Sequence, residues 1–322
     1  MSRQDVSRQG APPRLPRDPA GREFDAALAH LELTVRVRLD GLLHGNYVGL
    51  LPGPGSESGE SRQYDPGDDV RRMDWPVTAR TTVPHVRQTI ADRELETWVV
   101  MDLSPSLDFG TAGCEKRDLA VAALAAVVYL TQRGGNRIGA LIIGGGEAVR
   151  VPALPGRAHA QGLLRRVART PRAATGQRGD LAAAAELMRR PPRRRGLVVL
   201  VSDFLGEYVD GYDWERPTRA LAAHHEVLAV EVVDPRELSL PAVGMLTVVD
   251  PETGQEVEVQ TSDRRLRDRY AAAAAAQRAA IAGSLRRAGA AQLRLSTDGD
   301  WLLDIVRFVA ARRRGVSGGA AR

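Results

Sequence analysis

The sequence predicts an α/β protein built on a Rossmann-like, doubly wound and mostly parallel sheet. The first observation behind this prediction is a series of short, continuous apolar runs, which are typical of strands buried on both faces. The second is that segments with helical spacing follow these runs in turn, and such alternation favours a parallel sheet with helices on both faces. The third is that two of the runs end in an aspartate, Asp102 and Asp203.

The elements can be placed along the chain from these patterns. Buried strands are expected at 98–101, 138–143, 197–202 and 227–233, and helices at 23–40, 116–132, 158–168, 180–188 and 218–224. The stretch 81–96 alternates weakly and indicates extended structure. Towards the C-terminus we expect an edge hairpin of 245–249 and 256–260, a long Ala-rich helix capped by Ser262 and Asp263, a strand at 292–295 and a closing helix at 301–312.

Composition sets bounds on the core and the compartment. Hydrophobic residues make up 43% of the 322 residues and aromatic residues only 4%, so the core must consist mainly of Ala, Val and Leu. One cysteine, Cys114, excludes a disulfide framework and fits a reducing compartment. No apolar run is long enough to span a bilayer, and residues 1–22 lack the apolar stretch of a secretory signal. We therefore expect a cytoplasmic protein.

The positive charge comes almost entirely from arginine. The net charge is +5, which raises the question of nucleic acid, yet lysine occurs only once, at Lys116. The basic run 189–195 contains no aromatic residue that could stack on bases. We interpret most of these arginines as solvated surface cations and do not expect a nucleic-acid partner.

The residues after the first aspartate predict a metal site. Carboxyl ends of parallel strands lie at one edge of a sheet, so Asp102 and Asp203 can face each other. Ser104 and Ser106 stand at alternate positions, which directs both hydroxyls to the same side of an extended loop. Such oxygen donors suit Mg²⁺, or Mn²⁺ or Ca²⁺. The sequence thus predicts a divalent metal held by Asp102, Ser104, Ser106 and Asp203.

The D-x-S-x-S loop resembles the metal-ion-dependent adhesion site (MIDAS) of von Willebrand factor A domains. The resemblance implies that the loop's Asp and two Ser are ligands, that the second Asp binds through water, and that an acidic side chain of a partner completes the shell. The family's additional Thr ligand is replaced here by Gly179. Asp180 and Thr175 are nearby oxygen donors, but neither is aligned with that Thr.

The segment 62–80, RQYDPGDDVRRMDWPVTAR, is the most specific motif of the chain. It resembles the signature of a bacterial family known as domain of unknown function 58, and the resemblance extends from about Gly53 to the C-terminus. It implies a MoxR-type AAA+ ATPase as partner and a chaperone-like role in assembly. The matching positions are Arg62, Tyr64, Gly67, Asp68, Asp69, Arg71, Asp74, Trp75, Ala79 and Arg80.

This segment also has a purely structural interpretation. Its aspartates and arginines are close enough in sequence to form an ion-pair network that clamps it to the following domain, and we favour this over an exposed recognition surface. The expected organisation is a disordered N-terminus at 1–20, a signature region at 21–96 with a small mixed or β extension, a von Willebrand factor A-like domain at 97–313 and a flexible tail at 314–322.

Three functions fit the sequence. The leading one is a non-enzymatic module that binds a partner and a client protein through the metal site. The second is a metal-dependent hydrolase that uses the same carboxylates together with Asp108 and Asp180. The third is a metal-free pseudo-site that binds through its surface alone. Neither Cys114, which lacks a nearby His, nor the glycines at 144–146, which lack the Lys-Ser/Thr of a phosphate loop, indicates a catalytic or cofactor site.

Overall fold

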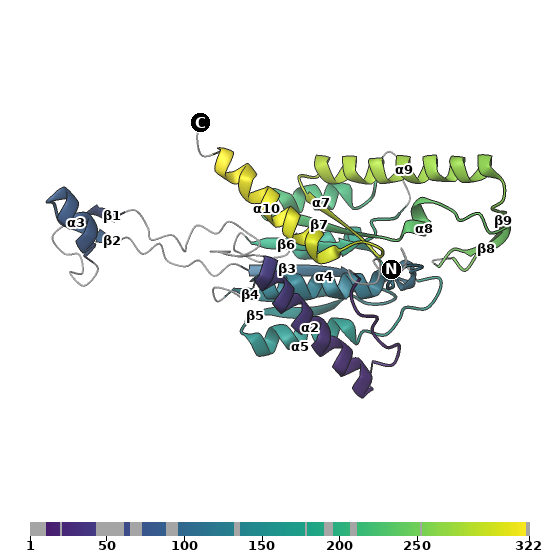
Figure 1. Ribbon diagram of the computed structural model, residues 1–322, viewed down its shortest axis with the longest axis horizontal. Coiled ribbons are helices and arrows are strands. Elements are labelled where there is room, and N and C mark those ends of the chain that lie inside the picture. Colours follow the sequence, from purple (N-terminus) through teal and green to yellow (C-terminus); the bar gives the residue numbers. More distant parts are fainter. Residues whose placement is uncertain are drawn as a thin grey trace.

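The computed structural model contains one six-stranded sheet in the order β10-β7-β6-β3-β4-β5 (Figure 1). It describes residues 11–19, 21–42, 61–64, 73–87, 96–131, 136–177, 179–189, 196–206, 211–251 and 253–319. The parallel strands are β3 (Glu96–Asp102), β4 (Arg137–Ile143), β6 (Leu197–Ser202), β7 (Glu226–Val233) and β10 (Ala291–Ser296). At one edge β5 (Val149–Pro155) pairs antiparallel with β4. The predicted mostly parallel sheet is therefore confirmed.

Two hydrophobic clusters cover the two faces of this sheet. Because side chains alternate along a strand, Val99 and Met101 of β3 face one cluster, whereas Trp98 and Val100 face the other. The first cluster includes residues of α4 (Lys116–Thr131), α5 (Arg157–Ala168) and α10 (Trp301–Gly319). The second includes residues of α6 (Leu181–Arg189), α7 (Glu215–Ala222) and α9 (Arg264–Arg287).

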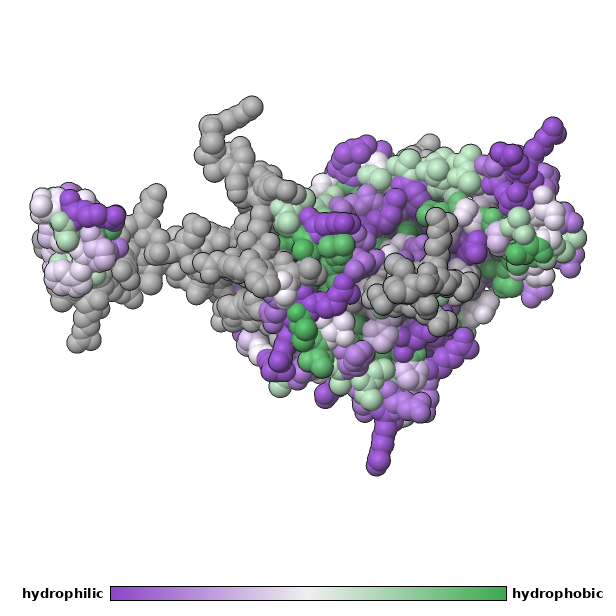
Figure 2. Space-filling view, viewed as in Figure 1, coloured by the Kyte–Doolittle hydropathy of each residue, from purple (hydrophilic) through white to green (hydrophobic). Residues whose placement is uncertain are grey.

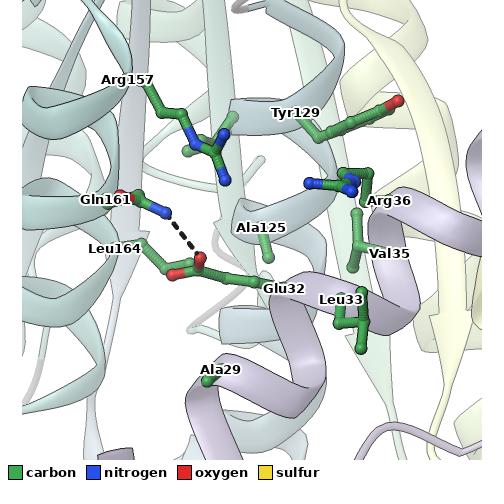
Figure 3. A pocket seen from close by; sticks show the side chains of 11 residues that line it. Ala29, Glu32, Leu33, Val35, Arg36, Ala125, Tyr129, Arg157, Gln161 and Leu164 are labelled. Atoms are coloured by element: carbon green, nitrogen blue, oxygen red, sulfur yellow. Dashed lines mark hydrogen bonds between the residues drawn. The ribbon is translucent and has the colours of Figure 1, made fainter.

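The helix α2 (Arg22–Leu42) belongs to this same unit. Its buried side chains recur at helical spacing along one face and join the first cluster, against α4 and α10. The boundary expected at residue 96 therefore does not separate α2 from the sheet. A cavity of about 300 Å³ lies between α2, α4 and α5, where Gln161 donates to Glu32 at 3.0 Å (Figure 3). The buried residues of α2 are Phe24, Leu28, Leu31, Val35 and Leu39.

A small mixed unit precedes the sheet in the sequence. Its strands β1 (Ser61–Gln63) and β2 (His85–Arg87) pair antiparallel. Between them α3 (Trp75–Thr81) begins where the Asp74 side chain accepts a hydrogen bond from Val77 N–H. This helix was not predicted, and extended structure is found at 85–87 within the stretch expected to be extended. The ion pairs expected of Asp68, Asp69 and Arg71 lie outside the described residues.

Other differences concern the ends of the chain and the C-terminal hairpin. We expected residues 1–20 to be disordered, but Arg14 donates to the carbonyls of Ala112 and Gly113, and Leu15 N–H donates to Asp118. The closing helix α10 continues to Gly319 instead of ending at Arg312. The hairpin of β8 (Met245–Val249) and β9 (Glu256–Gln260) forms a sheet of its own, not an edge of the large one. In the described residues, no helix is both long and apolar enough to cross a bilayer.

Candidate metal and docking site

The carboxyl ends of β3 and β6 bring the two predicted aspartates together. Ser202, the last residue of β6, donates from its hydroxyl to Asp102 Oδ2 at 2.7 Å, and Asp203 follows directly. Both carboxylates are buried, with relative exposures of 5% for Asp102 and 2% for Asp203. The parallel-sheet rule thus predicted their proximity correctly. Ser202 was not predicted as part of the site, although it stands beside Asp203 in the chain.

The loop after β3 places its two serines beside Asp102. The backbone N–H of Ser104 donates to Asp102 Oδ1 at 3.0 Å, and the Ser104 and Ser106 hydroxyls are hydrogen-bonded to each other with their oxygens 3.1 Å apart. Both serines are buried, and Pro105 begins a short 3₁₀ turn, η2 (Pro105–Asp108), that holds Ser106 near Ser104. Three side-chain oxygens from one loop therefore converge at the sheet edge.

Asp203 has a cationic partner that the sequence analysis missed. Lys116, the first residue of α4, donates from Nζ to Asp203 Oδ2 at 2.8 Å and also to Glu237. Its side chain is completely buried. The remaining oxygen, Asp203 Oδ1, accepts the backbone N–H of Leu205 at 3.1 Å. The available signal was compositional, since Lys116 is the only lysine of an arginine-rich chain.

Further ion pairs extend from Lys116 into the protein. The Arg278 guanidinium donates to the Asp203 carbonyl at 3.0 Å, to Glu231 at 3.1 Å and to Glu237 at 3.0 Å. Arg294 donates to the other oxygen of Glu231 at 2.8 Å. We call this set the Lys116 network. It contains three acids and three bases, so its charges balance, and its members are Lys116, Asp203, Glu231, Glu237, Arg278 and Arg294.

The two strand-terminal aspartates differ in their acidity. Burial raises the pKa of Asp102 above its ordinary value, and the negative charge of Asp203 raises it further. Burial would also raise the pKa of Asp203, but the Lys116 ammonium and its hydrogen bond outweigh that effect and hold the pKa below the ordinary value. The edge thus contains one carboxylate that is electrostatically satisfied and one that is not.

A third aspartate follows β7 and has a structural role. Asp234 is completely buried and accepts hydrogen bonds from Thr111 N–H at 2.8 Å, the Thr111 hydroxyl at 2.6 Å and the Thr297 hydroxyl at 2.7 Å. It also begins α8 (Pro235–Leu238) in a capping box with Glu237. Asp234 therefore ties three loops of this edge together, and it fixes the backbone that presents Glu237 to Lys116.

Gly179 lies against Asp102, at the position where the resemblance to von Willebrand factor A adhesion sites leads us to expect a Thr. A Cβ atom added to Gly179 would stand 2.6 Å from Asp102 Oδ1, so no side chain fits there unless Asp102 moves. Neither nearby oxygen donor replaces that Thr. Asp180 accepts the N–H of Ala183 at 2.7 Å and caps α6, while the Thr175 methyl group faces Gly254 in the β8–β9 turn.

The additional carboxylate considered for a hydrolase is also engaged elsewhere. Asp108 forms ion pairs with Arg117 at 3.3 Å and with Arg172 at 3.0 Å. In the part of the chain that the structure describes, no three His, Cys, Asp or Glu side chains are grouped so that they could hold a metal. Among the described residues, the serine hydroxyls are therefore the oxygen donors that add to the carboxylates at the β3–β6 edge.

The oxygens of the Asp102 loop do fit a small divalent cation. Mg²⁺ binds oxygens at about 2.0–2.1 Å in an octahedron, which places adjacent ligands about 3 Å apart. The Ser104 and Ser106 oxygens, 3.1 Å apart, match this separation. Asp102, Ser104 and Ser106 can therefore hold Mg²⁺, whereas Asp203 already faces Lys116 and Gly179 offers no side-chain oxygen.

Comparison with known sequences identifies relatives over nearly the whole chain. A family model described as "Protein of unknown function DUF58" matches residues 60–280. An uncharacterized protein of Mycobacterium tuberculosis and one of Mycobacterium bovis are each 61% identical over 294 residues, which cover 91% of this chain and 91% of theirs. An uncharacterized protein of Mycobacterium avium is 54% identical over 170 residues, or 53% of this chain and 98% of that protein.

Solved structures with similar folds are more distant. BatB from Bacteroides thetaiotaomicron is 14% identical with a TM-score of 0.42, over 68% of this chain and 99% of that one. A von Willebrand factor type A protein from Catenulispora acidiphila is 13% identical with a TM-score of 0.37, over 71% and 43%. Because both scores are below 0.5, the fold described above rests on this chain's own strand order.

Proposed function

The chain belongs to the family of proteins of unknown function DUF58, and from its sheet-edge geometry we propose that it is a non-enzymatic protein-interaction module. In this proposal an acidic side chain of a partner docks at the edge formed by Asp102, Ser104 and Ser106, with Asp203 beside them. A Mg²⁺ ion held there would supply an open coordination position for the partner's carboxylate. Mn²⁺ and Ca²⁺ are the alternative ions.

The observation that carries the proposal is the spacing of the two serine hydroxyls beside an unsatisfied carboxylate. Ser104 Oγ and Ser106 Oγ are 3.1 Å apart, close to the separation of adjacent ligands in a Mg²⁺ shell. Asp102 has no cationic partner in the described residues, and its hydrogen bonds come from neutral donors, Ser104 N–H and the Ser202 hydroxyl. A buried carboxylate in these surroundings favours a bound cation.

The surface near this edge also supports docking of a protein. The turn of the β8–β9 hairpin reaches the loop before Gly179, because Gly254 lies against Thr175. Figure 2 shows apolar surface at the end of the molecule where Figure 1 places β8 and β9. Exposed apolar side chains beside a polar edge are typical of interaction surfaces. On and beside this hairpin they are Val243, Met245, Val248, Val249 and Val257.

The first partner to test is a MoxR-type AAA+ ATPase, which the family resemblance implies, in a cytoplasmic chaperone-like assembly with a client protein. The purified chain would be immobilised and offered a purified MoxR-type ATPase from the same organism, with Mg²⁺ or with EDTA. We expect retention in Mg²⁺ and loss of retention in EDTA. Asp102→Ala and the double variant S104A/S106A should lose retention even with Mg²⁺, because each removes oxygens from the shell.

A matched control removes an aspartate elsewhere. Asp268 is 70% exposed and forms an ion pair with Arg264 on α9. Asp268→Ala should be retained like the unaltered chain. Retention of the ATPase that survives both EDTA and Asp102→Ala would refute metal-dependent docking at this edge.

A further inference from the structure

The single lysine of the chain is placed at the candidate site and not at the surface. Lys116 has a side-chain exposure of 0%, and its Nζ contacts both Asp203 and Glu237. A lysine ammonium is a compact point charge that can donate to several carboxylates at once, whereas the planar guanidinium of arginine needs a wider, forked arrangement of acceptors. The one lysine of this chain thus stands where a single ammonium group contacts two carboxylates.

We propose that Lys116 is the built-in counter-ion of Asp203, so that a divalent metal at this edge is held by Asp102, Ser104 and Ser106, without Asp203 as a ligand. This inference rests on the proposed function, because it concerns the ligand set of the same edge. Both Asp203 oxygens are engaged, Oδ2 by Lys116 at 2.8 Å and Oδ1 by the Leu205 N–H at 3.1 Å. A metal bound directly to Asp203 would compete with the Lys116 ammonium for the same buried carboxylate.

The charge balance of the edge leads to the same assignment. The Lys116 network is neutral by itself, with three acids facing three bases. Asp102 stands outside it as a single negative charge, with neutral donors around it. A divalent cation on Asp102 therefore leaves one net positive charge, which favours one additional carboxylate. Lys116 thus sets the charge of the edge so that it selects an acidic partner group over a neutral one.

Calorimetric titration of the full chain with Mg²⁺ alone separates the roles of the two aspartates. The variants are Asp102→Asn and Asp203→Asn, which change shape as little as possible and keep one side-chain oxygen. We expect Asp203→Asn to bind Mg²⁺ within about twofold of the unaltered chain, and Asp102→Asn to bind it at least about tenfold more weakly, the scale on which metal-site residues act. A loss of about tenfold or more in Asp203→Asn would overturn the assignment.

A second measurement tests Lys116 itself and does not require that the unaltered chain bind metal. Lys116→Met leaves Asp203 buried without its cation, so its melting temperature in EDTA should fall by about 10 °C. The double variant K116M/D203N removes the charge as well and should regain most of that loss. If Asp203→Asn does not relieve the K116M defect, Lys116 is not the counter-ion of Asp203.

The two measurements distinguish failure of this inference from failure of the proposed function. If the unaltered chain takes up no Mg²⁺ at millimolar concentration, the metal-dependent function fails, and recovery in K116M/D203N still decides the role of Lys116. If Mg²⁺ binds and Asp203→Asn abolishes binding, the function survives and the assignment of Lys116 fails. Should K116M not fold, the Mg²⁺ titration of Asp203→Asn remains decisive for the ligand set.

Discussion

The ends of β3 and β6 have the same local design but opposite electrostatic outcomes. Each is an apolar strand buried in the same sheet with an aspartate at its carboxyl end, and Ser202, which precedes Asp203 in the chain, donates its hydroxyl to Asp102. Asp203 meets an ammonium ion, and its pKa is lowered. Asp102 meets hydroxyl and N–H groups, and its pKa is raised. The fold thus places both carboxylates at this edge, whereas the side chains that contact them from other elements determine the pKa of each carboxylate.

The largest expected effect comes from removing the cation on the β6 side. Lys116→Met should lower the free energy of unfolding by about 3–5 kcal/mol, because it leaves the buried Asp203 and the partly buried Glu237 facing an apolar side chain. Urea unfolding monitored by circular dichroism measures this change. Arg264→Met is the matched control, since Arg264 is 86% exposed, and it should change stability by less than about 0.5 kcal/mol. Equal effects of the two variants would mean that the Lys116 network contributes nothing.

A smaller loss is expected from the carboxylate of the same pair. Asp203→Asn should cost about 2–3 kcal/mol, because Lys116 keeps Glu237 as a partner and the Asn oxygen can still accept the Leu205 N–H. The loss should shrink as the pH falls. Asp203 has a lowered pKa in the folded state, so its stabilisation is present above its ordinary pKa and is lost as the pH drops through the folded value. Unfolding at pH 7 and pH 3 tests this, and a loss that grows towards acid would be inconsistent with the pairing.

A side chain at Gly179 should disturb the β3 side through a steric effect. Gly179→Thr, which introduces the residue type of the adhesion sites that the Asp102 loop resembles, should cost about 1–3 kcal/mol, because its Cβ would lie 2.6 Å from Asp102 Oδ1. Gly146→Thr is the control, since a Cβ there meets no atom within 4 Å. If Gly179→Thr is as stable as that control and strengthens Mg²⁺ binding, the edge is more adaptable than the contacts around Asp102 indicate.

The smallest effect, and the one with opposite sign, is expected at Asp102. In EDTA at pH 7, Asp102→Asn should be neutral or stabilising by up to about 1 kcal/mol, since it removes a buried charge that has no counter-ion. Asp102 has a raised pKa in the folded state, so its contribution to stability is present at low pH and is lost as the pH rises through the folded value. The advantage of the variant should therefore grow from pH 4 to pH 7. A variant that is clearly destabilised at pH 7 would show that the hydrogen bonds to Asp102 already compensate for the burial of its charge.

The strands and the meeting of the two aspartates could be predicted from the sequence for a physical reason. A strand buried on both faces must be continuously apolar, and parallel strands place their carboxyl ends at one edge. The apolar runs before Asp102 and Asp203 were therefore sufficient to predict that these two strands are buried and that the two aspartates lie at the same sheet edge. The short helix α3 was missed because its start depends on Asp74 capping a segment without helical periodicity.

The partners of the aspartates could not be predicted in this way. Lys116, Glu237 and Arg278 come from α4, α8 and α9, and no spacing rule connects residues that are 41 to 121 positions apart. The place of α2 was missed for a similar reason. Its spacing shows that one face is buried, but not that α4 and α10 cover it.

The most direct test of the contrast between Asp102 and Asp203 is to measure both pKa values in the metal-free protein. Aspartate labelled with ¹³C at the side-chain carboxyl would be titrated by NMR in EDTA, with Asp102→Asn and Asp203→Asn used to assign the two resonances. We predict that Asp102 titrates above the ordinary aspartate value of about 3.9 and Asp203 below it. The opposite order, or two carboxyls that titrate together near that value, would contradict the account.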